Sequence, residues 1–496
     1  MGRIESRRGG GHGRQRFPEA PDPHPRRDAG GGQGASPGPR AVRRLAAGSD
    51  RGPAADADRD GQDLTGGRPA AATAAQALAA LDTAACLRLA QELVRIPSVT
   101  GEEQAVQDRV AAAMSEAGLE VDRFEADLPR LRAHPRFPGA EVERDKALLV
   151  AGVLGTRGDR ALILNGHVDV VPPGDRQRWR ASPWSGHVEA GRLYGRGACD
   201  MKAGVAVMLT AAAALSRSGI PLRGRLILQS VVSEEDGGLG TFAMIDRGFR
   251  ADAAIILEPT RLRPIAAQAG ALTFRLRILG RAAHASVRYE GVSALEKFAL
   301  VEARLRQLER DLNAEVHPAF REYAVPYALS IGKVRAGAWA ATVPELLEAE
   351  GRVGVPIGMA SSAVRRRLEA ALADAARQDA WMTEHPPQVE WTGGQFDAAE
   401  ADLDHPAFKA LRQAHGQELG VDPRPLGAPY GSDMRLFVHE AEMPAILYGP
   451  GDIRQAHATD EWVAVDEVVR AARVVTLAAA TYLGADQLPS SAGCGA

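Results

Sequence analysis

Short apolar segments alternate with helical segments through the middle of this chain, and this alternation restricts the available folds more than any other feature. The apolar segments cover residues 148–153, 161–164, 226–232 and 253–257, and helical patterns between them cover 203–216 and 239–247. Apolar runs of this length are typical of buried strands, and strands that alternate with helices form mostly parallel sheets. The sequence therefore predicts an α/β fold with a mostly parallel sheet. Open sheets of this kind bind ligands at the carboxyl ends of their strands.

A different order of elements begins near residue 271. Strand patterns cover 271–279, 327–334, 346–355 and 388–391, and helical patterns cover 294–312 and 361–377. This βαββαβ order is that of the ferredoxin-like split unit. Because strand and helix patterns resume at 408–479, we predict that the ferredoxin-like unit is an insertion. The first domain is then discontinuous, with residues 73–268 and 392–486 on either side of an inserted domain at 269–391.

The two ends of the chain differ in composition from the rest. Residues 1–72 are rich in Gly, Pro, Arg, Asp and Ala, and they contain almost no aromatic or β-branched residues. Such a segment cannot bury enough apolar surface to offset the entropy lost on ordering, so we predict that it is disordered. It also lacks the apolar run behind a basic start that a secretory signal needs. Residues 487–496 are predicted to form a loose tail.

Charge and cysteine content exclude several kinds of partner. The 496 residues carry 60 basic and 63 acidic side chains spread along the chain, for a formal net charge of −3. This balance gives no field that would recruit nucleic acid or an anionic membrane, and the longest apolar run, 205–215, is too short to cross a membrane. The three cysteines lie far apart without a paired spacing, which favours a reducing compartment. We expect a cytoplasmic protein that acts on a small molecule.

Imidazole and carboxylate side chains follow the predicted strands in a pattern that suits metal ions. The candidate ligands are His167, Asp200, Glu235, Glu258 and His457. Two dications about 3.5–4 Å apart need a shared anion, and Asp200 is predicted to be that bridge. His167 and Glu258 would complete the shell of one ion. Glu235 and His457 would complete the shell of the other, because nitrogen and oxygen donors of this kind are normal for zinc. Cobalt and manganese also suit these ligands.

Two neighbouring residues are predicted to serve the ligands and the water between the ions. Asp169, two residues after His167, can accept the second imidazole N–H and so fix the tautomer. Glu234, next to Glu235, is the predicted general base, since one of two adjacent carboxylates can bind the metal while the other takes a proton from water. Each motif alone has an ordinary explanation. A His-x-Asp pair is more often a surface or capping pair, and a Glu pair before Asp-Gly-Gly is often an acidic turn.

The motifs together resemble those of a known enzyme family. GHVDVVPPGD, GRLYGRGACDMKAG, SEEDGGLG, LEPT, GRAAHAS and YGPGDIRQAHATDEW occur in this order. They are similar to the motif set of the zinc amidohydrolase family that includes acetylornithine deacetylase, succinyl-diaminopimelate desuccinylase, aminoacylase and glutamate carboxypeptidase. The resemblance covers about residues 74–484 and implies the same ligand, orienting and base roles.

The resemblance also implies features that the residues alone do not give. His284 in GRAAHAS matches a histidine that reaches the scissile carbonyl oxygen, from the partner subunit in dimeric members. A cis peptide between Asp200 and Met201 and a homodimer formed through the inserted lid domain are likewise implied. For substrate binding, Gly431 and Ser432 match a loop whose backbone N–H groups meet the substrate. Arg352 lies two residues from the position of a carboxylate-binding arginine, on the same strand face, whereas the asparagine expected in the 341–344 stretch is absent.

We therefore predict a two-metal hydrolase that cleaves a linear amide, most simply by removing an acyl group from an amino-acid-like amine. A dipeptidase or carboxypeptidase of the same fold is the alternative within this class. From another class, the alternative is a metal-binding or partner-binding protein that has lost catalysis. The presence of Glu234 argues against that alternative, because loss of catalysis usually removes the base.

Overall fold

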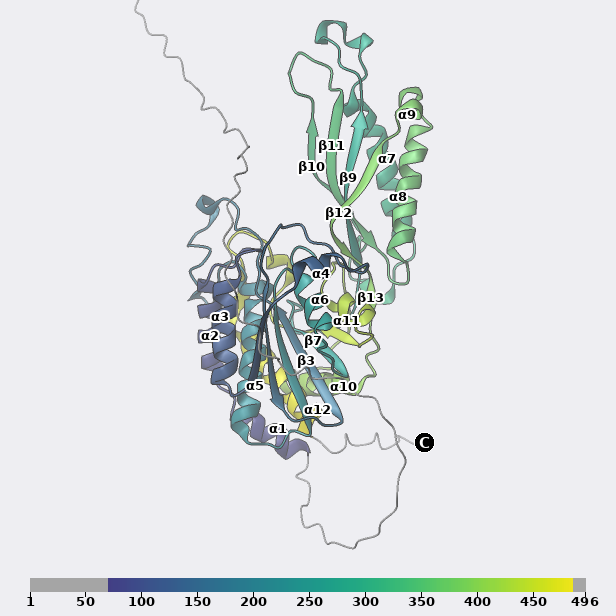
Figure 1. The fold of residues 1–496 in the computed structure, drawn as a ribbon. Coiled ribbons are helices and arrows are strands. Elements are labelled where there is room, and N and C mark those ends of the chain that lie inside the picture. Colours follow the sequence, from purple (N-terminus) through teal and green to yellow (C-terminus); the bar gives the residue numbers. More distant parts are fainter. Residues whose placement is uncertain (1–69, 485–496) are drawn as a thin grey trace, which may run out of the picture. The chain divides into compact units, whose positions relative to one another are not determined.

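The computed structural model of this protein describes residues 70–484, drawn in colour in Figure 1. The predicted loose tail and residues 1–69 of the predicted disordered segment lie outside the described residues. Helix α1 (Ala70–Ala79) starts three residues before the predicted boundary at residue 73. Its sequence, AAATAAQALA, is mostly alanine, the strongest helix former, so propensity extends the helix into a segment with little apolar bulk to bury.

The larger sheet confirms the predicted α/β class. Its strand order is β1-β2-β6-β3-β7-β15-β8-β13, with β14 also paired to β8. The strands are β1 (Glu120–Glu125), β2 (Leu148–Gly155), β3 (Arg160–His167), β6 (Gly224–Val231), β7 (Ala253–Ile256), β8 (Ile265–Gln268), β13 (Ala399–Glu400), β14 (Leu426–Ala428) and β15 (Ala445–Leu447). Strands β6, β3, β7 and β15 pair in parallel at the centre. Toward the edges, β1 with β2, β2 with β6 and β13 with β8 are antiparallel.

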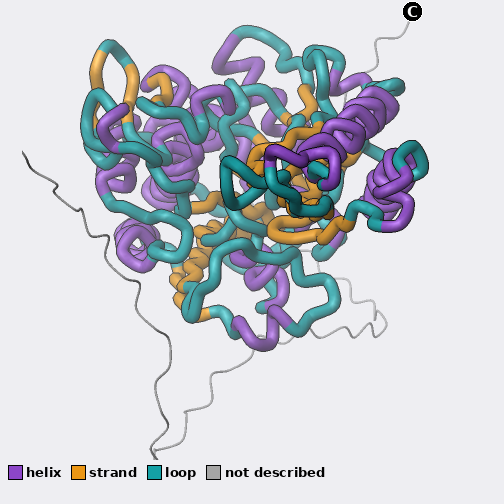
Figure 2. Tube along the Cα trace, turned by 90° about the horizontal axis from the view of Figure 1, so that it is seen from above, coloured by secondary structure: helices purple, strands orange, loops and turns teal. Residues whose placement is uncertain are grey.

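Helices cover both faces of this sheet. They are α2 (Thr83–Arg95), α3 (Gln104–Glu116), α4 (Leu128–Arg132), α5 (Ala203–Ser218), α6 (Leu239–Asp246), α10 (Pro406–Leu419), α11 (Met434–His439) and α12 (Val465–Gly484). The chain crosses from β3 to β6 through α5 and returns past β3 to β7 through α6. Because such crossovers are right-handed and these two run in opposite directions, α5 and α6 lie on opposite faces. In Figure 1, α2, α3 and α5 lie together on one side, and Figure 2 shows strands running between helices.

Helix α5 is unusually apolar. Together with the turn before it, residues Ala198–Ser218 are long and apolar enough to cross a membrane, yet 94% of their apolar stretch is buried inside the protein. Nearly all residues of the helix are buried, on every side of it, including Val205, Met208 and Leu215. A helix that is apolar on all sides is the kind that occupies a protein core. We therefore interpret α5 as the central core helix of this sheet.

A second sheet has its own buried core. Its strands, in the order β10-β11-β9-β12, are all antiparallel, and they are β9 (Gly270–Leu279), β10 (Leu329–Ala336), β11 (Leu346–Val355) and β12 (Gln388–Phe396). Helices α7 (Ala294–Leu312), α8 (Ser361–Ala376) and α9 (Ala380–Glu384) complete the predicted βαββαβ order. Strand β12 continues to Phe396, past the predicted end at Trp391, because its pairing shifts register there and resumes beyond two glycines. A lid or dimerisation role for this unit stays a prediction.

A small third sheet joins two segments that are far apart in the sequence. Strand β5 (Arg192–Tyr194) pairs with β4 (His187–Glu189) and with β16 (Trp462–Ala464). Segment 195–202 follows β5, and segment 456–461 precedes β16. This pairing therefore brings the residues around Asp200 next to those around His457. Short 3-10 turns at Arg176–Arg178, Ala285–Glu290, Pro318–Phe320 and Ile453–Gln455 complete the described elements.

Close packing of α5 against the end of β7 gives a stability prediction. A Cβ on Gly204 would lie 2.1 Å from the backbone oxygen of Leu257, the residue before Glu258. We expect Gly204→Ala to lower the free energy of unfolding by about 1–3 kcal/mol, since one backbone must move away from the other. Chemical denaturation measures this. Gly416→Ala, in helix α10 with only one atom at 3.8 Å, is the matched control, and it should be neutral or stabilising because alanine favours helices. Equal stability of both variants would contradict this packing.

Candidate metal centre

Three neighbouring parallel strands deliver most of the predicted ligands to one edge of the sheet. His167 is the last residue of β3, Glu234 and Glu235 follow β6, and Glu258 follows β7. These strands are adjacent in the order β6-β3-β7. Parallel neighbours end at the same edge, so side chains separated by up to ninety-one positions meet there. The prediction that the ligands gather at the carboxyl ends of the strands is thus matched by the structure.

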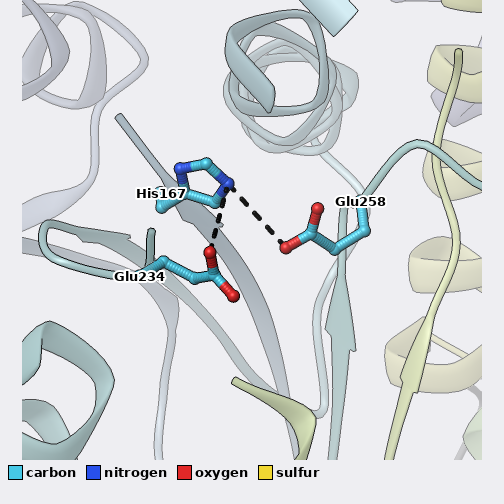
Figure 3. A group of neighbouring side chains, drawn as sticks. All are labelled: His167, Glu234 and Glu258. Carbon is cyan, nitrogen blue, oxygen red and sulfur yellow. Dashed lines mark ion pairs between the residues drawn. The ribbon is translucent and has the colours of Figure 1, made fainter. Parts of the chain in front are cut away.

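The side chains around His167 point toward one another. Its Nε2 lies 3.0 Å from Oδ1 of Asp200, 3.8 Å from Oε1 of Glu258 and 4.0 Å from Oε2 of Glu234. Figure 3 shows the imidazole facing the two glutamates across the strand ends. His167 is 1% exposed, and the three carboxylates are also buried. Two groups of donor atoms, each within 4.8 Å of one another, could hold a metal ion: His167 with Glu234 and Glu258, and His167 with Asp200 and Glu235.

His457 meets the other predicted ligands from the opposite end of the chain. Its Nε2 lies 2.9 Å from Oε2 of Glu235 and 3.6 Å from Oδ2 of Asp200. The two oxygens of Asp200 thus face the two imidazoles, Oδ1 toward His167 and Oδ2 toward His457. A carboxylate placed between two imidazoles is suited to bridge two ions. We refer to His167, Asp200, Glu234, Glu235, Glu258 and His457 as the acid–imidazole cluster.

The electrostatics of this cluster favour a cation. Burial raises the pKa of Glu234 and Glu258 well above their usual value, and other carboxylates add to the rise. Burial also raises the pKa of Glu235, with the charge of Asp200 acting in the same direction. The hydrogen bond with Glu235 raises the pKa of His457 to about 9. Buried carboxylates in such number repel one another unless protons or cations compensate them. Carboxylate and imidazole donors fit zinc and similar divalent ions.

The structure shows which atoms of Asp169 face His167. Asp169 is predicted to accept the second imidazole N–H of His167. In the structure the nearer acceptor is the backbone carbonyl of Asp169, at 3.0 Å, while the closer carboxylate oxygen lies at 3.6 Å. The carboxylate instead accepts the backbone N–H groups of Glu234 at 3.3 Å and Glu235 at 3.2 Å. Asp169 therefore orients the imidazole through its main chain and the glutamate turn through its side chain.

The expected cis peptide is present between Asp200 and Met201. It lies in the turn Ala198–Lys202, immediately before helix α5. The turn is buried throughout, and the Nζ of Lys202 donates to the backbone oxygens of Leu93 at 3.0 Å and Ile96 at 2.7 Å. These carbonyls end helix α2, so a buried lysine satisfies them. The segment carrying Asp200 is thereby attached to the helix layer.

The remaining predicted residues lie in different surroundings. His284 is exposed, its Nδ1 is 2.7 Å from Oγ of Ser286, and it forms a backbone bridge to Thr342. Within residues 70–484 it makes no hydrogen bond or ion pair with the acid–imidazole cluster. Ser432 is buried, and its hydroxyl donates to the side-chain oxygen of Gln268.

Arg352 and Gly431 both approach the ring of Phe396. The guanidinium of Arg352 lies 5.3 Å from the ring centre. Desolvation lowers the pKa of Arg352, and the negative charges of Glu234 and Glu235 counteract that shift. The guanidinium charge therefore interacts with these two carboxylates. A Cβ on Gly431 would lie 2.5 Å from Cβ of Phe396, so only glycine fits this approach. Among the three substrate-binding candidates, Arg352 is the charged residue, and its charge attracts the carboxylates of the cluster.

Sequence reasoning did not assign a role to two residues beside the cluster. Glu461 is 1% exposed and forms an ion pair with Arg196, whose guanidinium nitrogen lies 2.6 Å from it. Both residues stand inside motifs quoted above, GRLYGRGACDMKAG and AHATDEW. Nothing in their spacing showed that they would meet, because the contact depends on the pairing of β5 with β16.

A mixed α/β sheet with carboxylates and an imidazole buried at the ends of its parallel strands, and a second imidazole facing them from a loop, is an arrangement suited to a metal-dependent hydrolase. The particular family follows from comparison with known proteins. A family model described as peptidase family M20/M25/M40 matches residues 163–481, and this chain belongs to that family.

Two curated relatives and one solved structure illustrate the similarity. The chain is 27% identical over 397 residues to N-formyl-4-amino-5-aminomethyl-2-methylpyrimidine deformylase of Bacillus subtilis, covering 75% of this chain and 88% of that protein. It is 31% identical over 400 residues to succinyl-diaminopimelate desuccinylase of Methylorubrum extorquens, covering 77% and 95%. The Bacillus subtilis YXEP protein, described as a dinuclear metal binding peptidase, superposes with a TM-score of 0.53 at 16% identity over 81% of this chain and 98% of that one. The structural likeness concerns the fold.

The contacts of Asp169 generate a prediction about the glutamate turn. Asp169→Asn keeps the shape of the side chain but replaces one acceptor oxygen by an amide donor, which cannot accept an N–H. The turn carrying Glu234 and Glu235 should shift, and zinc affinity should fall by about 10–100-fold. Competition with a chelator measures this affinity. Thr100→Val is the control, since it removes only the hydroxyl that donates to the same carboxylate at 3.3 Å. An equal or larger effect of Thr100→Val would contradict the role of Asp169.

Proposed function

We propose that this protein is a two-metal hydrolase that removes an acyl group from an amino-acid-like amine by cleaving a linear amide bond. The observation that carries this proposal is the convergence of His167, Asp200, Glu235, Glu258 and His457 at the carboxyl edge of the sheet. The names of the two curated relatives describe removal of a formyl and of a succinyl group. Both support deacylation of an amine as the reaction class.

A second candidate function is hydrolysis of a dipeptide or of a carboxyl-terminal peptide bond. The structural likeness to a protein described as a peptidase supports it. The two functions share the metal centre and differ in the group released with the amine. For either reaction, Arg352 is a candidate for binding a substrate carboxylate, because it carries a positive charge close enough to interact with Glu234 and Glu235. Backbone groups of Gly431 and Ser432 are the candidates for contacting the rest of the substrate.

The residues that would hold the metal ions fall into two groups. His167 and Glu258 would bind one ion, Glu235 and His457 the other, and Asp200 both. When bound, two such ions polarise the substrate carbonyl and lower the pKa of water, which is chemistry that the protein side chains do not supply. Zinc suits the donor set first, followed by cobalt and manganese.

Glu234 is the proposed general base. It is 9% exposed, and its Oε2 lies 4.0 Å from Nε2 of His167, so it stands beside the candidate ligands. Burial raises the pKa of Glu234 well above its usual value. A carboxylate of raised pKa can take a proton from the attacking water and return it to the leaving amine near neutral pH. The carboxylate of Asp169 would hold Glu234 in place by accepting the backbone N–H of Glu234.

His284 is proposed to act from a second subunit. It is exposed and held within its own loop by Ser286 and Thr342. Strand β10 lies at the edge of the second sheet, where its free backbone groups could pair with the same strand of a second copy. A dimer of this kind, formed by the inserted lid domain in a cytoplasmic enzyme, would bring an imidazole from one subunit to the carbonyl oxygen in the other.

The test of the proposed function is release of a primary amine from a set of compounds, with and without added zinc or cobalt. The set contains N-formyl, N-acetyl and N-succinyl amino acids, an N-formylated aminomethyl heterocycle, and dipeptides. Preferential turnover of N-acyl compounds is expected. Preference for dipeptides would favour the second candidate. If the protein binds metal but releases no amine from any of these compounds, the result would favour a protein that has lost catalysis.

Two matched substitutions separate the base from its neighbouring ligand. Glu234→Gln should abolish turnover with bound metal near the wild-type amount, because an amide keeps the shape but cannot accept the proton of water. Glu235→Gln should lose metal as well as turnover. Elemental analysis together with turnover measures both. If Glu234→Gln loses metal while Glu235→Gln keeps it, the two assignments are reversed.

A mixing experiment tests whether His284 acts across the subunit boundary. His284→Ala should lower the maximal rate by about 100-fold or more without changing metal content, because one donor to the developing oxyanion is lost. Mixing it with an Asp200→Ala chain rebuilds one intact site only if His284 acts on the partner subunit. Recovered activity is expected. If none is recovered although subunit exchange is verified, His284 acts within its own chain or has no role.

A further inference from the structure

A buried ion pair lies between the two segments that carry Asp200 and His457. Nη1 of Arg196 is 2.6 Å from Oε2 of Glu461, and the two side chains are 3% and 1% exposed. Buried ion pairs seldom stabilise a fold more than apolar side chains of the same size would. The hydrogen bonds that the two charged groups make to the surrounding backbone are therefore more informative than their mutual attraction.

Glu461 holds the segment of Asp200. Its second oxygen, Oε1, accepts the backbone N–H of Cys199 at 2.9 Å and that of Asp200 at 3.1 Å. Hydrogen bonds to a charged acceptor are about twice as strong as neutral ones, and a low-dielectric surrounding strengthens them further. The backbone that aims the Asp200 carboxylate at both imidazoles is thus fixed by one side chain.

Arg196 holds the segment of His457. Its Nη2 donates to the backbone oxygen of His457 at 3.3 Å, and its Nη1 donates to that of Ala458 at 3.2 Å. His457 has a φ of 60°, a left-handed conformation that residues other than glycine seldom adopt. The two hydrogen bonds from Arg196 hold the carbonyls at and after this residue. The planar guanidinium presents its donors in a fixed geometry, and it thereby serves both segments at once.

We propose that Arg196 and Glu461 are positioning residues that set the distance between Asp200 and His457, and thereby the affinity for the ion these two residues would share with Glu235. Neither residue contacts that ion. The inference rests on the proposed two-metal function. The other ion shares Asp200, but its ligands His167 and Glu258 lie at strand ends that the sheet holds independently of this pair. Loss of the pair should therefore weaken the ion near His457 selectively, that is, more strongly than the other ion.

Zinc titration of the metal-free protein against a chromophoric chelator tests this. Wild type should show two dissociation constants, and His457→Ala identifies which of them belongs to the ion near His457. In wild type, one oxygen of Glu461 accepts from Arg196 and the other accepts from the backbone. In Glu461→Gln one of these oxygens becomes an NH2 group, which is a donor and therefore faces another donor. That ion should bind about 10–100-fold more weakly, and the affinity for the other ion, which shares only Asp200 with it, should fall by a clearly smaller factor.

Two further variants keep the test valid if Glu461→Gln folds poorly. The double variant Arg196→Met with Glu461→Gln leaves no unpaired buried charge, which is the usual cause of misfolding at such a site. It still lacks the bonds to His457 and Ala458, and should show the same selective loss. Glu418→Gln is the matched control, because it breaks an ion pair with Arg473 that lies between helices α10 and α12. Both zinc affinities should be unchanged in this control.

The outcomes separate the inference from the proposed function. Wild-type protein that binds fewer than two zinc ions would overturn the two-metal function. Two ions in wild type, with both affinities unchanged or equally reduced in the double variant, would overturn only the role of Arg196 and Glu461. Selective weakening of the ion assigned by His457→Ala supports that role.

Discussion

The structure depends on holding several carboxylates close together away from water. Asp200, Glu234, Glu235 and Glu258 are largely buried around two imidazoles, and burial raises the pKa of all three glutamates. Such a group is unfavourable by itself, because like charges repel and desolvation disfavours the ionised form. It is maintained because the carboxylates lie next to the ends of strands and a helix whose own packing is favourable. The core around α5 and the parallel strands supplies that packing.

Two kinds of support hold the cluster. Parallel pairing of β6, β3 and β7 places His167, the glutamate turn and Glu258 at one edge, so these positions follow from backbone hydrogen bonds of the sheet. Asp200 and His457 have no such support, since both lie in segments outside the strands. Their position depends on the third sheet and on hydrogen bonds from buried side chains. Most polar groups as deeply buried as these form hydrogen bonds, and the bonds from Glu461 and Arg196 hold the backbone on both sides of the cluster.

Arg352, the proposed binding residue for a substrate carboxylate, shares an aromatic ring with a second arginine. The guanidinium of Arg352 lies beside the ring of Phe396, at the register shift of β12 where the second sheet returns to the larger one. Arg435 stacks on the same ring at 3.9 Å and donates to the backbone oxygen of Gly237 in the glutamate turn at 2.6 Å. The ring of Phe396 therefore contacts the guanidinium groups of both Arg352 and Arg435. Through Arg435, it links the second sheet to the turn that carries the proposed base.

The sequence by itself determined the strand and helix order, the edge of the sheet where the ligands gather, and the identities of the clustered residues. Apolar periodicity is local, and the carboxyl ends of parallel strands meet in any such sheet. Three things required the tertiary structure. The carbonyl of Asp169, not its carboxylate, is nearer to His167. Strand β12 resumes beyond two glycines. Arg196 meets Glu461 across 265 residues. These depend on angles and on pairings between distant segments, and neither spacing nor composition encodes them.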